Sequence, residues 1–137
     1  MDQLTPASRE VLSEDQMAFY ESEGYLVLEN RLDDTMVEAI RDEIARLSAP
    51  AAAMTESDDR IDLEDSHTPG DPRVRRIKLP HKQSTLFNDL LHSDAILAPV
   101  RDLIGPDLRL HTTKLNMKLA GYGAAIEWHQ DLSLIHI

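Results

Sequence analysis

The chain has 137 residues and a formal net charge of −11, from 14 Lys and Arg against 25 Asp and Glu, so it lacks the basic surface that nucleic acids or anionic membranes require. It has no cysteine, which excludes disulfides and thiolate metal sites and leaves His, Asp and Glu as candidate metal ligands. The length suits one small domain, and without a signal peptide or a membrane-spanning run a cytoplasmic protein is expected.

The first thirty residues predict a short helix followed by a strand. Ser13 and Gln16 have the spacing of a capping box, and Gly24 follows the last residue that fits a helix. These signals predict a helix over Glu14–Glu23. The run Tyr25–Glu29 is apolar and rich in strand-forming residues, so we expect a short strand there.

A second helix is predicted after Asp33 or Asp34, either of which can cap it, and Pro50 marks its end. Apolar residues recur within it at steps of three and four, which gives one face for burial. These residues are Val37, Ile40, Ile44 and Leu47.

The middle of the chain predicts a loop, a strand and two further helices. Ala49–Asp71 is acidic with few apolar residues, so a long flexible loop is expected. Arg73–Pro80 predicts a strand, and Ser84–Leu91 predicts a helix. A further helix is expected over Ser93–Ile104, with a kink or a restart at Pro99, because proline has no N–H to donate.

From Leu108 the apolar period changes to two, which predicts a strand as far as Gly121. Apolar and polar side chains alternate along it, so one face should be apolar and the other polar. The apolar residues are Leu115, Met117 and Leu119, and the polar residues are Lys114, Asn116 and Lys118. A glycine-rich turn signal follows, and it predicts a returning strand over Ala125–Asp131.

The returning strand carries the pair with the clearest chemistry, His129 and Asp131. Residues two apart on a strand project from the same face, so an imidazole and a carboxylate lie side by side. Such a pair supplies two of the three ligands of a two-His-one-carboxylate iron site, which leaves three metal positions for a cosubstrate and oxygen. Standing alone, a His-x-Asp sequence is more often a surface polar pair, so the spacing by itself does not establish a metal site.

Four motifs place this pair in a wider pattern: GYLVLEN, IGPDL, KLNMK and EWHQD, in that order. With them the chain resembles the phytanoyl-CoA dioxygenase family, nearest the branch that includes ectoine hydroxylase. The resemblance implies an α+β fold in which N-terminal helices pack on the start of a double-stranded β-helix (a cupin-like jelly roll), with the barrel incomplete. It also implies non-haem iron(II), 2-oxoglutarate as cosubstrate, and hydroxylation of a small organic substrate with O2.

The same resemblance implies roles for individual residues. His129 and Asp131 match the first two iron ligands. Asn116 matches a position that helps to hold 2-oxoglutarate. Ile126 matches a position near that cosubstrate, and Thr112 matches one near the substrate.

Some family members also place a basic residue near the cosubstrate, and Lys78 or Arg76 stands in that region in a loose register. For Lys78 and Arg76 the interpretation as surface charges is the favoured one, and Asn116 is equally open to interpretation as a solvent-facing residue. The histidines outside the pair are expected to be structural or solvated. They are His67, His81, His92 and His111.

We interpret residues 1–137 as a single, truncated domain that is inactive alone, because the third iron ligand and the arginine for the far carboxylate of 2-oxoglutarate are missing. His136 lies roughly 17 Å from Asp131 along one strand, at about 3.4 Å per residue, so it does not fit as the third ligand. Residues 132–137, LSLIHI, differ from what the family shows after WHQD, and a non-native tail is expected there.

Two other interpretations remain open. One is a non-catalytic jelly-roll binding module in which His129 and Asp131 are vestigial. The other is a different metal enzyme on a cupin-like barrel. Such enzymes use mostly histidine ligands, so the Asp of HQD counts against this interpretation.

Overall fold

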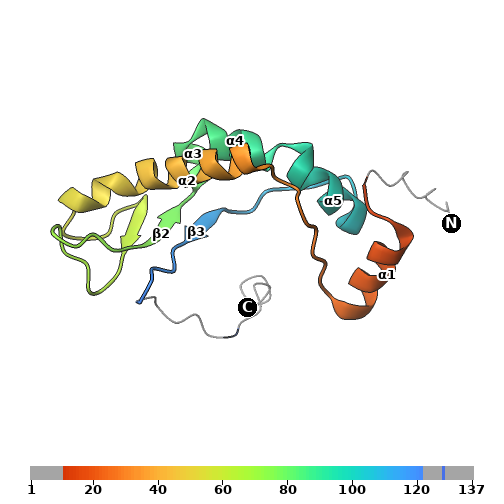
Figure 1. The fold of residues 1–137 in the computed structure, drawn as a ribbon, viewed down its shortest axis with the longest axis horizontal. Helices are drawn as coiled ribbons and strands as arrows, with labels where there is room; N and C mark the ends of the chain where they lie inside the picture. Colours follow the sequence, from red (N-terminus) through yellow and green to blue (C-terminus); the bar gives the residue numbers. More distant parts are fainter. Residues whose placement is uncertain (1–10, 122–127, 129–137) are drawn as a thin grey trace.

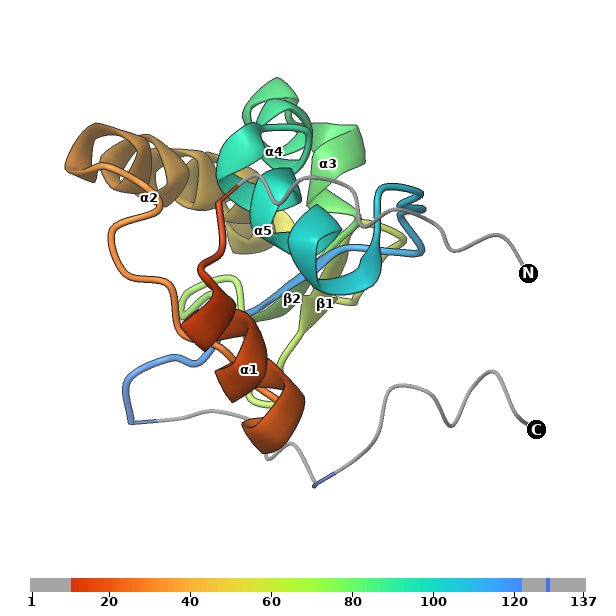
Figure 2. The same cartoon turned by 90° about the vertical axis from the view of Figure 1, so that its right-hand side faces the viewer.

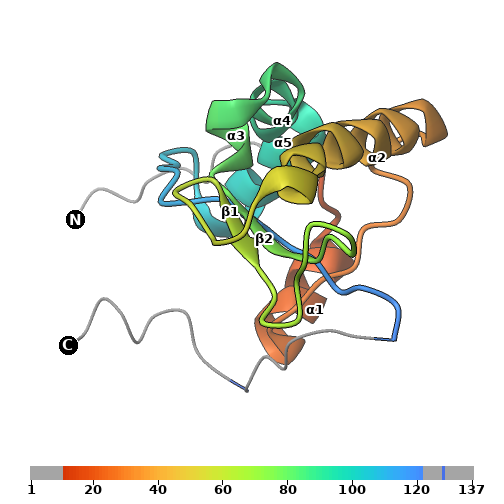
Figure 3. The ribbon, with the colours of Figure 1, turned by 90° about the vertical axis from the view of Figure 1, so that its left-hand side faces the viewer.

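The computed structural model describes residues 11–121 and residue 128. In chain order its elements are α1 (Glu14–Glu23), α2 (Asp34–Ser48), η1 (Ala49–Ala53), β1 (Ile61–Leu63), β2 (Val74–Lys78), α3 (Pro80–Gln83), α4 (Thr85–Leu91), α5 (Asp94–Ile104) and β3 (Lys114–Asn116). The strands form an antiparallel sheet in the order β1–β2–β3, and α2, α3 and α4 lie together on one side of it (Figures 1, 2 and 3). This mixture of helices and antiparallel strands is compatible with the predicted α+β class. Within the described part of the chain, no helix is long and apolar enough to cross a membrane.

The first predicted helix is confirmed together with its caps. The N–H of Ser13 donates to Oε1 of Gln16 (2.9 Å), the N–H of Gln16 donates to Oγ of Ser13 (3.2 Å), and Gly24 is left-handed with φ 79°. The predicted strand over Tyr25–Glu29 is wrong. Its backbone pairs with none of the described strands, and the side chain of Val27 is 69% exposed. Strand-forming residues need a neighbouring strand, and none is placed beside this run.

Helix α2 is confirmed, and its apolar stripe packs on the sheet. Oδ1 of Asp33 accepts from the N–H of Met36 at 2.7 Å and so caps the helix. Pro50 lies at the start of η1, where the α-helix has ended. The buried core joins α2, η1, the strands and α4, and consists of Leu47, Ala51, Ile61, Val74, Ile77 and Phe87.

The prediction of a long loop over Ala49–Asp71 is wrong, because the segment contains η1 and β1. Ala51 is fully buried and Ile61 is 2% exposed, so a few apolar residues are enough to join this acidic segment to the core. Some of its acidic groups have local roles. The N–H groups of Ile61 and Arg60 donate to the Asp58 carboxylate (2.7 and 2.8 Å) at the entry to β1, and they lower the pKa of Asp58.

Helix α5 runs through Pro99 without the predicted restart. Pro99 has no N–H to donate to the carbonyl of Ala95, one turn earlier. The guanidinium of Arg31, from the segment before α2, donates to that carbonyl from Nε (3.3 Å) and to the carbonyl of Asp94 from Nη2 (3.1 Å). A side chain distant in sequence therefore satisfies the acceptor that the proline leaves without its helical donor.

The N-terminal arm, residues 11–31, is held on α5 by polar contacts. Besides Arg31, Oδ2 of Asp102 accepts from the N–H groups of Val11 and Leu12, each at 2.8 Å. Helix α1 buries none of its own residues and lies at the end of the molecule away from the sheet (Figure 1). Hydrogen bonds to α5, more than an apolar helix face, thus position the arm.

The predicted strand over Leu108–Gly121 is present only as β3. Its alternation is confirmed as far as Met117, since Leu115 and Met117 pack against the core, whereas Leu119 is exposed. The strand is short because it pairs with β2, which is itself five residues long. Gly121 has φ 74°, as a turn requires, and the expected returning strand over Ala125–Asp131 lies outside the described residues except for residue 128.

Glu43 and Arg46 form an ion pair where α2 meets the start of α4. The guanidinium bonds the carboxylate twice, at 2.7 Å from Nε and 2.7 Å from Nη2. The Ser84 hydroxyl, which caps α4, bonds the same carboxylate. The bond from Arg46, followed by the bond from Ser84, lowers the pKa of Glu43 from 4.5 to about 2.

We expect Glu43→Gln to lower the thermal midpoint at pH 7. A carboxylate with a lowered pKa stabilises the folded state above its unfolded pKa, and this contribution is lost as the pH falls through the folded pKa. The difference between wild type and variant should therefore shrink between pH 4.5 and about 2. Thermal melts followed by circular dichroism across this range measure it.

Glu38→Gln is the matched control. Glu38 pairs with Arg41 at the same spacing in the same helix, but these side chains are 66% and 67% exposed. Solvent screens such a pair, so its loss should cost less. Equal losses for the two variants at every pH would contradict the role given to Glu43.

A second prediction concerns the contact between Arg31 and α5. Arg31→Ala should lower the free energy of unfolding by about 2 kcal/mol, because it removes charged donors from the backbone carbonyls of α5. In a Pro99→Ala background, residue 99 regains an N–H for the Ala95 carbonyl, so Arg31→Ala should cost less. Urea unfolding of the four proteins in this double-mutant cycle provides the comparison. An equal cost in both backgrounds would show that Arg31 does not compensate for the proline.

Candidate functional site

The strand register collects charged and amide side chains on one face of the sheet. Asp62 of β1, Arg76 of β2 and Asn116 of β3 are directly opposite one another, and Lys78 is opposite Lys114. Residues that pair across strands share a face, so these five side chains form one surface, here called the polar face. The helices α2 and α4 contact the opposite, apolar face of the sheet.

The side chains of the polar face contact one another. Nε of Arg76 donates to Oδ1 of Asn116 at 3.2 Å, and Nη1 of Arg76 lies 3.6 Å from Oδ2 of Asp62. Nζ of Lys78 lies 2.6 Å from Oδ1 of Asp62 and donates to the carbonyl of Asp58 at 2.8 Å. The Asp62 carboxylate thus pairs with Arg76 and Lys78, the two β2 cations on the polar face, and Arg76 in turn bonds the amide of Asn116.

The polar face is positively charged, whereas the chain as a whole is negatively charged. It has three cations, Arg76, Lys78 and Lys114, and one carboxylate, Asp62, in a protein of net charge −11. Lys and Arg only donate hydrogen bonds, and the Asn116 amide has two N–H donors besides its oxygen. Such a surface suits a carboxylate, which accepts hydrogen bonds and is negatively charged.

Three of the residues named from the sequence, Arg76, Lys78 and Asn116, lie together on the polar face. Thr112 is exposed two residues before β3. Ile126, His129 and Asp131 lie outside the described residues, so their predicted roles stay predictions. In the part of the chain that the structure describes, no group of three His, Asp or Glu side chains has the arrangement of a metal site.

Sequence reasoning missed Asp62, which pairs with Arg76 and Lys78 of β2. It lies in β1, within the segment interpreted as a loop, so no strand parity was available to place it. The alternation of Ile61, Asp62 and Leu63 is the signal that was present, although three residues are too few to indicate a strand without a partner.

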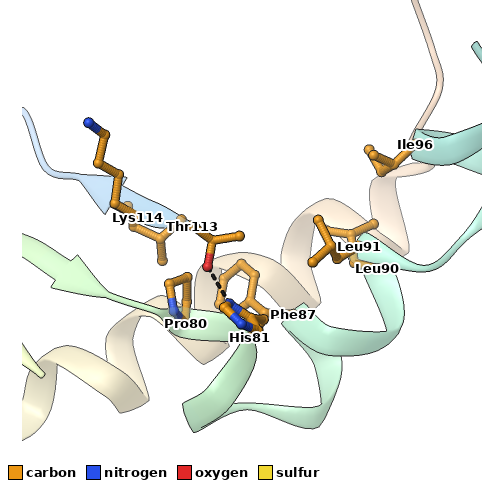
Figure 4. Close-up of a pocket in the computed structure, with 9 residues that line it drawn as sticks. Pro80, His81, Phe87, Leu90, Leu91, Ile96, Thr113 and Lys114 are labelled. Atoms are coloured by element: carbon orange, nitrogen blue, oxygen red, sulfur yellow. Dashed lines mark hydrogen bonds between the residues drawn. The ribbon is translucent and has the colours of Figure 1, made fainter. Parts of the chain in front are cut away.

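A separate cavity of about 240 Å³ lies between β3 and the helices on the apolar side (Figure 4). Its lining is mostly apolar and includes Phe87, Leu90, Leu91 and Ile96. A ring nitrogen of His81 bonds the Thr113 hydroxyl at its edge, and His67 bonds the backbone of Met54 and Arg73. These bonds within the fold confirm the structural role expected of the two histidines.

Comparison with known proteins gives a single family. The phytanoyl-CoA dioxygenase (PhyH) family model matches residues 20–137. The chain is 30% identical over 129 residues to an ectoine dioxygenase from Bordetella parapertussis, with 93% of this chain and 40% of that protein covered. It is 27% identical over 136 residues to an ectoine dioxygenase from Nocardia farcinica, covering 99% and 44%.

A further relative is a probable alpha-ketoglutarate-dependent hypophosphite dioxygenase from Stutzerimonas stutzeri. It is 26% identical over 117 residues, with 85% of this chain and 41% of the relative covered. The chain therefore spans less than half the length of the curated relatives that it matches. Because the family model matches most of its residues, the chain belongs to the phytanoyl-CoA dioxygenase family.

Proposed function

We propose that this chain is the N-terminal part of an iron(II)- and 2-oxoglutarate-dependent dioxygenase that hydroxylates a small organic substrate. In this proposal the described sheet is the start of a double-stranded β-helix, with α2, α3 and α4 packed outside it. In this arrangement the polar face lines the interior of the barrel. The family membership of the chain supports the proposal, as does the packing of α2 and α4 on the apolar face of the sheet.

The observation that carries the proposal is the polar face. It gathers Arg76 and Lys78 of β2 with Asn116 of β3 opposite the helices, and β3 is the last described strand before His129 and Asp131 in sequence. The N–H donors of Asn116 and Lys78 suit one carboxylate of 2-oxoglutarate, and Ile126 is proposed to lie near the same cosubstrate.

His129 and Asp131 are the proposed iron ligands, which agrees with a chain that has no cysteine and hence an N/O donor set. Bound iron would activate O2 as 2-oxoglutarate is oxidatively decarboxylated. The described residues have a different task, which is to bind and orient the cosubstrate beside the metal. Thr112 is proposed to lie near the substrate.

The substrate is proposed only as a class. The names of the relatives point to two compounds, ectoine and hypophosphite, so membership in this group does not select one of them. Both are small and polar, but hypophosphite is inorganic, so the proposed small organic substrate follows the ectoine dioxygenases. Substrate-contacting residues lie commonly on loops, which vary more between members than the strands do.

The complete gene product should produce succinate from 2-oxoglutarate in the presence of iron(II) and ascorbate. His129→Ala and Asp131→Ala should each reduce this turnover by at least about 100-fold, because each removes a metal ligand. His92→Ala is the matched control, since His92 bonds the Asn88 carbonyl at the end of α4 and should leave turnover unchanged. If the complete, folded protein neither binds nor consumes 2-oxoglutarate, the alternative of a non-catalytic binding module is the better one.

The 137-residue chain alone should bind iron(II) weakly and should not consume 2-oxoglutarate. Two ligands from one strand do not fix the geometry of a metal that needs a third ligand from elsewhere. Succinate formation by this chain can be compared directly with that of the complete protein. Steady turnover by the short chain, abolished by His136→Ala, would overturn the interpretation of residues 132–137 as a tail without function.

A further inference from the structure

The orientation of the Asn116 amide is determined by its neighbour. A guanidinium has only donors, so the atom of Asn116 that faces Nε of Arg76 at 3.2 Å must be the oxygen. The two ends of an amide are otherwise hard to tell apart, and the hydrogen-bond network decides between them. With the oxygen engaged, Nδ2 and its two N–H donors point away from Arg76. Within residues 11–121 and 128 this nitrogen has no hydrogen-bond partner.

Asp62 restrains Arg76 from the other side. Its Oδ2 lies 3.6 Å from Nη1 of Arg76, and its Oδ1 lies 2.6 Å from Nζ of Lys78. Asp62, Arg76 and Asn116 occupy directly paired positions on the three strands. The sheet therefore carries a row of side chains, carboxylate to guanidinium to amide, that runs across its polar face and ends in a pair of N–H donors.

We propose that Asp62 and Arg76 are positioning residues that hold the Asn116 amide with its N–H donors toward a carboxylate of 2-oxoglutarate. The proposal rests on the function proposed above and adds a reason for the chemical selectivity of this site. An amide that is free to rotate presents a donor or an acceptor with similar ease. An amide fixed by Arg76 presents donors only, which favours a carboxylate and disfavours a ligand that itself donates.

The chain contains a matched control for the charge of Arg76. Arg75 is its neighbour in β2, and it lies at the irregularity between the Asp62–Arg76 and Leu63–Val74 pairs, where it is exposed. Arg75→Gln and Arg76→Gln change the net charge equally at adjacent positions. A difference between them reports on the contacts of Arg76 rather than on its charge.

The test measures the affinity of the complete, iron(II)-loaded protein for 2-oxoglutarate by calorimetry without oxygen. We expect Arg76→Gln to weaken binding about tenfold and Arg75→Gln to weaken it less than about twofold. Arg76→Lys keeps the charge but loses the planar group that reaches both partners, so it should also weaken binding several-fold. Full affinity in Arg76→Lys would show that charge alone suffices, and it would overturn the positioning role.

A double-mutant cycle separates positioning from general damage to the sheet. If Arg76 acts through Asn116, then Arg76→Gln should have almost no further effect on affinity in an Asn116→Ala background. Equal effects in both backgrounds would overturn the proposal. Thermal midpoints of all variants establish that each one is folded under the conditions of the titration.

A second readout needs neither metal nor cosubstrate. The side-chain N–H signals of Asn116 in a 15N-labelled protein can be assigned by their loss in Asn116→Ala. They should shift in Arg76→Gln and Asp62→Asn but not in Arg75→Gln. Unchanged signals in Arg76→Gln would contradict the positioning of the amide.

The two proposals fail in different ways. If the folded wild-type protein does not bind 2-oxoglutarate, the proposed function fails, and the inference fails with it. If the wild type binds and Arg76→Gln behaves like Arg75→Gln, the positioning role fails while the proposed function stands. Weaker binding in Arg76→Gln, together with shifted Asn116 signals, supports both.

Discussion

The arrangement of the sheet depends on the burial of Ile77 at the centre of β2. Ile77 is fully buried and is paired with Ile61 on one side and Leu115 on the other, against α2 and α4. Because side chains alternate along a strand, a slip of one residue would bring the neighbouring charges into the core. The free-energy cost of burying these charges prevents such a slip. The buried isoleucine therefore fixes Arg76 and Lys78 on the opposite face, and an apolar contact determines where the polar chemistry lies.

The same alternation keeps the charged residues of β1 and β2 on the face of the sheet that is not buried against the helices. Asp62, Arg76 and Lys78 are partly exposed, so their ion pairs contribute little to the net stability of the fold. Their ion pairs and hydrogen bonds instead fix geometry, because each contact limits the orientation of the next side chain in the row. A face that is held by hydrogen bonds and ion pairs, and not by burial, is suited to exchange some of those contacts for a ligand.

The sequence was most informative where one local signal is enough. The caps of α1 and α2, the strand β2 and the alternation along β3 as far as Met117 were all predicted. The roles of Lys78 and Asn116 near the cosubstrate stay predictions, although the two residues share one face of the sheet. Long-range partners were not predictable. Tyr25–Glu29 has the composition of a strand but pairs with none of the described strands, whereas β1 is a strand only because β2 lies beside it. The same reason applies to Asp62 and Arg31, whose partners are distant in sequence.

Binding of a 2-oxoglutarate carboxylate to the polar face through Asn116 can be observed in a crystal structure of the complete protein, grown without oxygen with iron(II) and 2-oxoglutarate. We expect Nδ2 of Asn116 within hydrogen-bond distance of a cosubstrate carboxylate, with Oδ1 still bonded to Nε of Arg76. A cosubstrate held away from the polar face, or an Asn116 oxygen turned toward the cosubstrate, would show that Asn116 does not bind it in this way.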